Sequence, residues 1–95
     1  MVDYILSEAA REDLKNIYRY GYERFGERQA EHYYDGLIGC FAKIAKSPFQ
    51  FQKVPEVGND YRRFVYISES IYYRVKNNRL EIMAIIGRQD ISNRL

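Results

Sequence analysis

YYRVKNNRLEIMAIIGRQD, residues 72–90, predicts two β-strands joined by a tight turn and followed by a polar segment that begins at Gly87. Asn77 and Asn78 suit the turn because asparagine adopts positive φ more readily than most residues. The second strand, from Arg79 to Ile86, alternates between two faces. One face is expected to carry Leu80, Ile82, Ala84 and Ile86, and the other Glu81, Met83 and Ile85. The end of this strand is apolar on both faces, as in a central strand.

Two more alternating segments precede this hairpin. Residues 61–67 and residues 71–75 both show the period of a half-buried strand. Ser68–Ser70, Ser-Glu-Ser, supplies the turn between them. Residues 49–60 contain Pro55, a glycine and an asparagine without either period, which indicates a loop or a short irregular strand.

The first half of the chain predicts a short strand and two helices. Residues 2–6 form the strand candidate, and Ser7 can cap a helix that begins at Glu8 and ends at Gly26. A second helix spans Glu27 to Lys46, where Ser47 and Pro48 stop the pattern. The apolar stripe of the first helix comprises Leu14, Ile17, Tyr18, Gly21 and Phe25. The two helices should form an antiparallel hairpin.

This order of elements predicts an α+β fold in one domain over residues 1–95. It consists of an N-terminal strand, a two-helix antiparallel hairpin and a three-stranded antiparallel sheet, with the helices on one face. The other face is the candidate functional surface. Arg74 and Arg88 can present guanidinium groups there, joined by Arg62 or Arg63 according to the parity of the preceding strand.

Size and composition limit the classes of protein. A chain of 95 residues buries enough surface to fold without a metal or a disulfide, and its single cysteine, Cys40, fits a reducing cytosol. The longest apolar run, Ile82 to Ile86, is far shorter than the roughly 20 residues of a membrane helix. No basic head or cleavage site follows Met1, so we expect a cytoplasmic protein without membrane contact.

Charge is distributed unevenly along the chain. Residues 1–35 carry eight acidic and five basic side chains, a balance of −3, whereas the remaining residues carry five acidic and ten basic ones, a balance of +5. The basic half favours an anionic partner, although a mixed and solvated surface explains the same counts.

Two long stretches and the order of elements resemble the ParE family of bacterial toxins, part of the RelE/ParE superfamily of type II toxin-antitoxin systems. They are LSEAAREDLKNIYRYGYERFG at residues 6–26 and YRRFVYISESIYYRVKNNRLEIMAIIGRQD at residues 61–90. The combination of R-x-F, I-x-Y-R-V and I-I-G-R-Q-D within the second stretch is the most specific part. The resemblance implies a growth-inhibiting toxin neutralised by a ParD-like antitoxin. It further implies DNA gyrase as the target, whereas RelE relatives cut messenger RNA in the ribosome.

The sequence favours protein binding over catalysis. The nuclease branch of the superfamily needs a proton carrier, and residues 88–95 lack the tyrosine or histidine that ribonuclease relatives place beyond this glycine. His32 lies on the charged side of the second helix, and arginine cannot serve as a base. Tyr66 or Tyr72 could substitute, so messenger RNA cleavage stays the alternative. We expect no catalytic residue, no metal site and no cofactor, and no sequence-specific binding of nucleic acid by the toxin alone.

Two sets of contact residues follow. Arg74, Arg88 and Asp90 are expected to meet the target, because Arg88 follows a glycine at the end of a rigid strand. For the antitoxin, we expect an amphipathic helix and an extended segment beside the helical hairpin and the sheet. Its contacts are predicted to be Tyr18, Tyr22, Phe25, Arg62 and Arg63, although the helical period favours core packing for Phe25.

Overall fold

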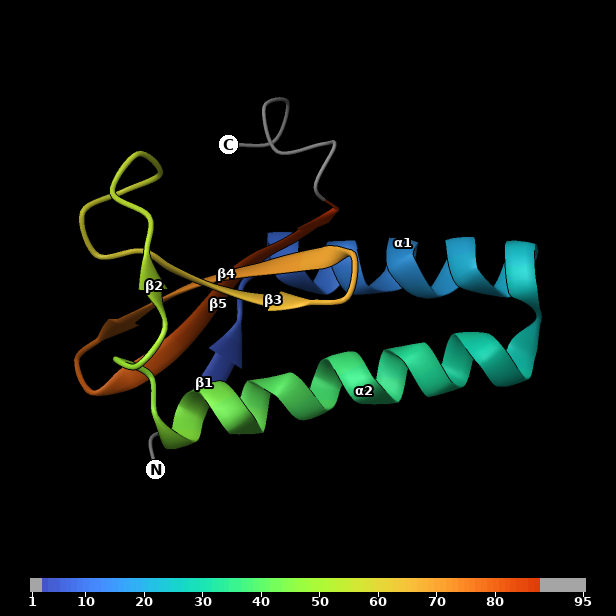
Figure 1. Cartoon of the computed structure of the whole chain (residues 1–95), viewed down its shortest axis with the longest axis horizontal. Coiled ribbons are helices and arrows are strands. Elements are labelled where there is room, and N and C mark those ends of the chain that lie inside the picture. The colour runs from blue at the N-terminus through green and yellow to red at the C-terminus, as the bar shows by residue number, and fades with distance from the viewer. Residues whose placement is uncertain (1–2, 88–95) are drawn as a thin grey trace.

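Two helices and five strands form the fold of residues 3–87, the part of the chain that the computed structural model describes. The elements are β1 (Asp3–Leu6), α1 (Glu8–Phe25), α2 (Glu27–Lys46), β2 (Gln52–Lys53), β3 (Arg62–Tyr66), β4 (Glu69–Lys76) and β5 (Arg79–Gly87). The strands form one sheet in the order β1-β5-β4-β3-β2, and the helices pack on it as an antiparallel hairpin (Figure 1). The expected α+β class is confirmed.

The sheet has more strands than the sequence predicts. β1 joins it by pairing in parallel with β5, while the other neighbours are antiparallel. β2, in the segment expected to be a loop or a short irregular strand, pairs with Arg62 and Arg63 of β3. Neither addition follows from the local pattern, because the partner strand supplies the hydrogen bonds that define a two-residue strand.

The helical hairpin has the bounds that the capping residues predict. Ser7 precedes α1 in an extended conformation, and its Oγ accepts a hydrogen bond of 3.0 Å from the N–H of Ala10. Gly26 separates the helices with φ of 92°, a conformation that glycine adopts without steric cost. In Figure 1 the turn between α1 and α2 lies far beyond the sheet, so none of the described strands lies beneath this end of the hairpin.

One of the two predicted strand turns is confirmed and the other is wrong. Asn77 and Asn78 form the β4–β5 turn with φ of 53° and 59°. The β3–β4 turn is made by Ile67 and Ser68, not by Ser68–Ser70, since Tyr66 pairs with Glu69. Ile67 has φ of 51°, which is unfavourable for a β-branched residue, so local preference pointed to the polar residues that follow.

A β-bulge at Met83 changes which side chains of β5 share a face. Tyr72 pairs with Ala84 and Tyr73 with Ile82, so Met83 is an extra residue in β5. The prediction that Ile82 and Ala84 share a face is therefore wrong. A bulge shifts the alternation by one residue, which the apolar pattern of the strand does not reveal.

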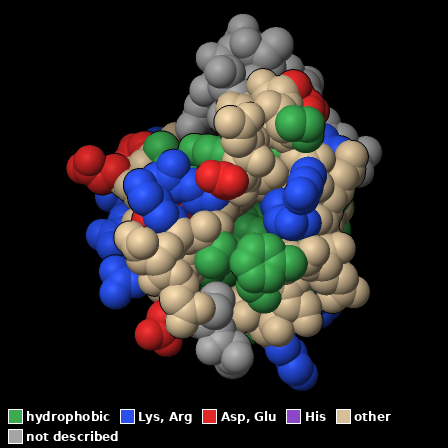
Figure 2. Space-filling view, turned by 90° about the vertical axis from the view of Figure 1, so that its left-hand side faces the viewer, with side chains coloured by type: hydrophobic (Ala, Val, Ile, Leu, Met, Phe, Trp, Pro, Cys, Tyr) green, Lys and Arg blue, Asp and Glu red, His purple; other side chains and the backbone are tan. Residues whose placement is uncertain are grey.

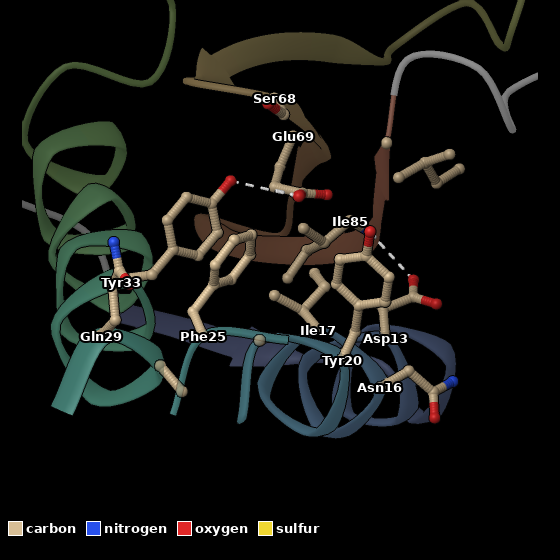
Figure 3. Close-up of a pocket in the computed structure, with 14 residues that line it drawn as sticks. Asp13, Asn16, Ile17, Tyr20, Phe25, Gln29, Tyr33, Ser68, Glu69 and Ile85 are labelled. Carbon is tan, nitrogen blue, oxygen red and sulfur yellow. Dashed lines mark hydrogen bonds between the residues drawn. The ribbon is translucent and has the colours of Figure 1, made fainter. Parts of the chain in front are cut away.

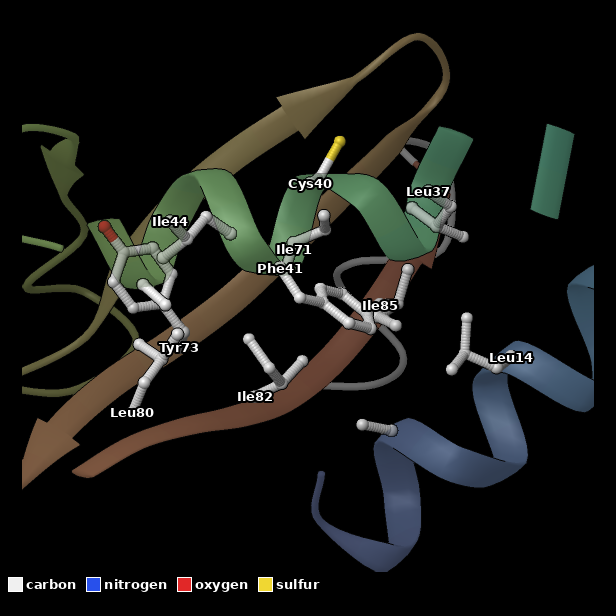
Figure 4. Packing of buried hydrophobic residues seen from close by; sticks show 12 residues of the cluster. Leu14, Leu37, Cys40, Phe41, Ile44, Ile71, Tyr73, Leu80, Ile82 and Ile85 are labelled. Atoms are coloured by element: carbon white, nitrogen blue, oxygen red, sulfur yellow. The ribbon is translucent and has the colours of Figure 1, made fainter. Parts of the chain in front are cut away.

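Two apolar clusters result, one on each face of the sheet. The larger one lies between the sheet and the helices (Figure 4) and includes Leu14, Leu37, Phe41, Ile44, Ile71, Tyr73, Leu80, Ile82 and Ile85. The smaller one, on the outer face, consists of Val54, Tyr72, Ala84 and Ile86, with Val57 and Tyr61 packed against it. Residues 54–61 therefore cover part of the outer face.

The start of α1 supplies hydrogen-bond partners to the backbone of β5 beyond the end of β1. Ser7 donates its N–H to the Ile82 carbonyl at 2.9 Å and its hydroxyl to the Met83 carbonyl at 2.8 Å. Further along α1, the Asp13 carboxylate accepts the N–H of Ile85 at 2.9 Å. Asp13 is only 4% exposed. This helix thus replaces a neighbouring strand by means of side-chain and backbone hydrogen bonds.

We predict that Asp13→Ala lowers the free energy of unfolding by about 1–3 kcal/mol, because the buried N–H of Ile85 loses its acceptor. Urea denaturation followed by circular dichroism measures the change. Glu12→Ala is the matched control, since Glu12 is the exposed neighbour in the same helix. Equal effects of the two substitutions would contradict the structural role of Asp13.

Candidate functional site

An open groove of about 890 Å³ runs between α1, the start of α2 and the β3–β4 turn, and reaches Gly87 at the end of β5 (Figure 3). Its aromatic lining residues are Tyr20, Phe25 and Tyr33. Two carboxylates, those of Asp13 and Glu69, also line it. The groove is an apolar, aromatic surface with acidic groups, which suits the side chains of a polypeptide more than a small charged metabolite.

Tyr33 and Glu69 connect α2 to β4 across the groove. The Tyr33 hydroxyl donates to Oε2 of Glu69 at 3.1 Å. Partial burial, together with the Glu69 carboxylate, raises the pKa of Tyr33 to about 12. The phenol therefore stays protonated at neutral pH and acts as a donor, not as a base.

Tyr66 passes over α2 at Gly36 and packs against Tyr33. The two rings lie 5.3 Å apart, and a Cβ placed on Gly36 would come within 2.0 Å of the Tyr66 hydroxyl. A side chain at this position would displace Tyr66, because the phenol occupies its space. The contact places Tyr66 on the helical side of the sheet.

The three apolar residues predicted for the antitoxin differ in exposure and in contacts. Phe25 lines the groove and is 59% exposed, so the prediction of core packing is wrong. Phe25 follows the apolar period of α1, but this end of the helix extends beyond the sheet. Tyr18 is half-buried and contacts the rings of Tyr22, at 6.2 Å, and Tyr34, at 5.7 Å. Tyr22 is 49% exposed.

Arg62 and Arg63 lie on opposite faces of the sheet, since they are neighbours in β3. Arg62 pairs with Tyr73 on the helical side, and its Nη1 donates to the carbonyls of Phe49 and Phe51 at 3.0 and 2.8 Å. These bonds hold the segment that follows α2. Arg62 therefore has a structural role that the sequence did not reveal.

Arg63 and Arg74 both lie on the outer face of the sheet. The alternation of the strand predicted this position for either Arg62 or Arg63. Arg63 donates from Nη2 to Oε1 of Gln52 at 3.2 Å. Arg74 forms an ion pair with Glu81, with Nε and Oε1 2.6 Å apart, and its guanidinium lies 5.9 Å from the Tyr61 ring centroid. The hydrogen bond to Glu81 is the main cause of a raised pKa for Arg74. Arg88 and Asp90 lie outside the described residues.

The end of the molecule that carries β2 and the β4–β5 turn combines apolar and basic side chains. Figure 2 shows hydrophobic groups in the middle of this end with Lys and Arg side chains on either side. The most exposed large apolar residue there, Phe49, is 66% exposed and lies 5.4 Å from the Arg62 guanidinium. The apolar and basic side chains of this surface can contact a partner. Catalysis would also need a side chain that donates or accepts a proton.

The side chains considered for catalysis in residues 3–87 differ in their surroundings. Tyr72 is fully buried, Tyr66 packs over α2, and His32 is exposed on α2. Burial raises the pKa of the Cys40 thiol. Within the same range no group of three His, Cys, Asp or Glu side chains could hold a metal ion, and neither helix is long and apolar enough to cross a membrane.

Comparison with known proteins places the chain in a family. Residues 4–91 match the family model described as the ParE toxin of the type II toxin-antitoxin system parDE. This chain belongs to the ParE toxin family. The resemblance stated from the sequence is therefore confirmed for the family.

Individual relatives agree with this assignment. The ParE-family chain is 34% identical over 86 residues to Toxin ParE1 of Caulobacter vibrioides, with 90% of this chain and 88% of that protein covered. It is 29% identical over 94 residues to Toxin ParE1 of Mycobacterium tuberculosis strain H37Rv, with 97% and 96% covered. A solved structure, the chromosomal ParDE toxin-antitoxin system from P. aeruginosa, superimposes with a TM-score of 0.81. At 19% identity, covering 92% of this chain and 96% of that one, it supports the fold.

The groove residues Asp13, Tyr33 and Glu69 were missed by sequence reasoning. A signal existed for Asp13, because it occupies a buried position between Ala10 and Leu14 in the apolar stripe of α1. An acid at such a position usually has a hydrogen-bond partner. Tyr33 and Glu69 gave no comparable signal, since they are 36 residues apart and meet only in the folded chain.

We predict opposite effects for two alanine substitutions in α2. Gly36→Ala should destabilise the ParE-family chain by about 1–3 kcal/mol, because the new Cβ displaces Tyr66 from its contact with Tyr33. Gly39→Ala should stabilise it by about 0.5–1 kcal/mol through helix propensity, as nothing lies within 4 Å of the new Cβ. Thermal unfolding of both variants tests the pair. Stabilisation by both would show that Tyr66 moves aside without cost.

Proposed function

We propose that this ParE-family chain inhibits growth by binding DNA gyrase without breaking bonds, and that a ParD-like antitoxin neutralises it. The observation that supports a binding mode is the open groove lined by Tyr20, Phe25 and Tyr33, together with the burial of Tyr72, one of the tyrosines considered as a proton carrier. The choice of gyrase comes from the family resemblance. Both proposed partners are proteins. An extended surface suits contact with a protein, whereas a compact active site suits a small molecule.

The outer face is the proposed target surface. Arg74 is half-buried there, fixed by Glu81 and by contact with Tyr61, so its guanidinium is held in a defined position. A fixed arginine suits recognition of a carboxylate, because little rotamer entropy remains to be lost on binding. We keep Arg88 and Asp90 as proposed target contacts because of their place in the sequence shortly after Gly87.

The helical hairpin is the proposed antitoxin surface. Tyr22 and Phe25 expose about half of their surface near a turn that projects past the sheet. Exposed aromatic residues close together are typical of hot spots for an amphipathic helix. Tyr18 packs against the ring of Tyr22, so we assign it a positioning role. Arg63 remains a candidate for an antitoxin carboxylate, whereas the carbonyl contacts of Arg62 make it a structural residue.

We predict that Tyr22→Ser together with Phe25→Ser weakens antitoxin binding by at least about tenfold, since two exposed aromatic contacts are lost. Calorimetry with a purified ParD-like antitoxin encoded beside this toxin measures the dissociation constant. Phe49→Ser is the control, because Phe49 is similarly exposed but lies on a different part of the molecule. If the control weakens binding and the double variant does not, the antitoxin surface lies elsewhere.

We predict that the purified toxin inhibits DNA supercoiling by gyrase and leaves messenger RNA intact on translating ribosomes. Arg88→Ala should reduce this inhibition several-fold, because a cationic contact to the target is lost. Arg94→Ala makes the same change of charge within residues 88–95 and should have a smaller effect. Cuts in messenger RNA at fixed codon positions, with normal supercoiling, would instead support a RelE-like endonuclease that uses Arg63 and Arg74 to hold phosphate.

A further inference from the structure

Two buried polar atoms on the outer face of the sheet have no hydrogen-bond partner among the residues that the structure describes. They are the hydroxyl oxygen of Tyr72 and Nε of Arg63. Tyr72 in β4 is fully buried and lies directly opposite Arg63 in β3, so the two side chains are neighbours on one face. A buried donor without a partner destabilises the fold, which makes this pair a candidate for contact with a ligand.

Hydrogen bonds within the fold orient the arginines of this face and leave some of their N–H groups unused. Gln52 accepts from Nη2 of Arg63, and Glu81 accepts from Nε of Arg74. Arg74 is two residues from Tyr72 in β4 and therefore lies on the same face. A guanidinium carries several N–H donors, so each arginine can donate further bonds. The donor cluster of Arg63, Tyr72 and Arg74 therefore suits a ligand that supplies acceptors, as an anion does.

Residues 54–61, which join β2 to β3, lie over Tyr72. Val54, Val57 and Tyr61 of this segment pack with Tyr72 in the smaller apolar cluster. The N–H of Val57 donates to the Val54 carbonyl at 2.9 Å, and the N–H of Val54 donates to the Tyr61 carbonyl at 3.0 Å. Because these bonds join residues of the segment to one another, it can lift from the sheet by losing side-chain contacts and thereby uncover the donor cluster.

We propose that the donor cluster binds the carboxylate of an acidic side chain from a protein partner, and that residues 54–61 lift to admit it. The carboxylate accepts from Tyr72 and from the arginines, which gives the two unpartnered buried atoms a partner. This inference rests on the proposed function, in which the outer face binds a protein, and it names the chemical group that the face recognises.

The surroundings of Tyr72 favour a side-chain carboxylate over a nucleic-acid phosphate. Apolar residues enclose this tyrosine, and the narrow stem of an aspartate or glutamate can enter such a site. A backbone phosphate is flanked by a sugar on each side, so it reaches buried donors less easily. Glu81 also neutralises part of the charge of Arg74, which suits a singly charged group. Lys76 and Arg79, exposed at the end of the same hairpin, attract an acidic partner to this face.

Adjacent tyrosines of β4 provide a matched pair of variants. Tyr72 and Tyr73 are both fully buried, but Tyr73 donates its hydroxyl to the Pro48 carbonyl at 2.7 Å. Tyr72→Phe removes an unpartnered hydroxyl, so we expect a higher urea midpoint of unfolding together with several-fold weaker carboxylate binding. Tyr73→Phe removes an existing hydrogen bond, so it should lower the midpoint without changing carboxylate binding.

The probe is an oligoglutamate peptide with blocked ends, titrated into the full chain and followed by the Nε–H signal of Arg63 in a nitrogen-15 spectrum. We expect the peptide to shift this signal more than an oligouridylate of equal charge does. A missing response to the peptide, lower stability of Tyr72→Phe, or unchanged peptide affinity in that variant would overturn the proposal. A response to the oligouridylate as large as that to the peptide would instead assign the face to nucleic acid. Because no step uses gyrase, these results are independent of the test of gyrase inhibition.

Discussion

The hydrogen bonds between the start of α1 and β5 are the constraint on which the rest of the fold depends. β1 pairs with β5 only as far as Ile82, and beyond that point β5 bulges at Met83. Ser7 and Asp13 then take the place of a strand and satisfy backbone groups of Ile82, Met83 and Ile85. Without them a central strand of the sheet would lose buried hydrogen bonds along one edge.

That constraint also determines where the groove and the exposed aromatic residues of the hairpin lie. Asp13 fixes α1 against β5, and the length of α1 then carries the hairpin turn past the sheet. Phe25 is exposed for this reason, although its spacing along the helix is that of a core residue. The same geometry opens the groove between the hairpin and the β3–β4 turn, with Asp13 on one wall and Glu69 on the other.

Arginine residues that are close in sequence have different roles in this protein. Arg62 stabilises the segment after α2, Arg63 contacts β2, and Arg74 forms a cross-strand pair with Glu81. A basic C-terminal half therefore does not imply one continuous cationic surface.

The sequence alone determined the family, the α+β class, the bounds of both helices and the β4–β5 turn. These features depend on local signals: Ser7 and Gly26 at helix ends, paired asparagines at positive φ, and short motifs along the strands. Tertiary structure alone decided the bulge at Met83, the pairing of β1 and β2, and the meeting of Tyr33 with Glu69. These features depend on which backbone groups and side chains from distant segments become neighbours, and no local pattern encodes that choice.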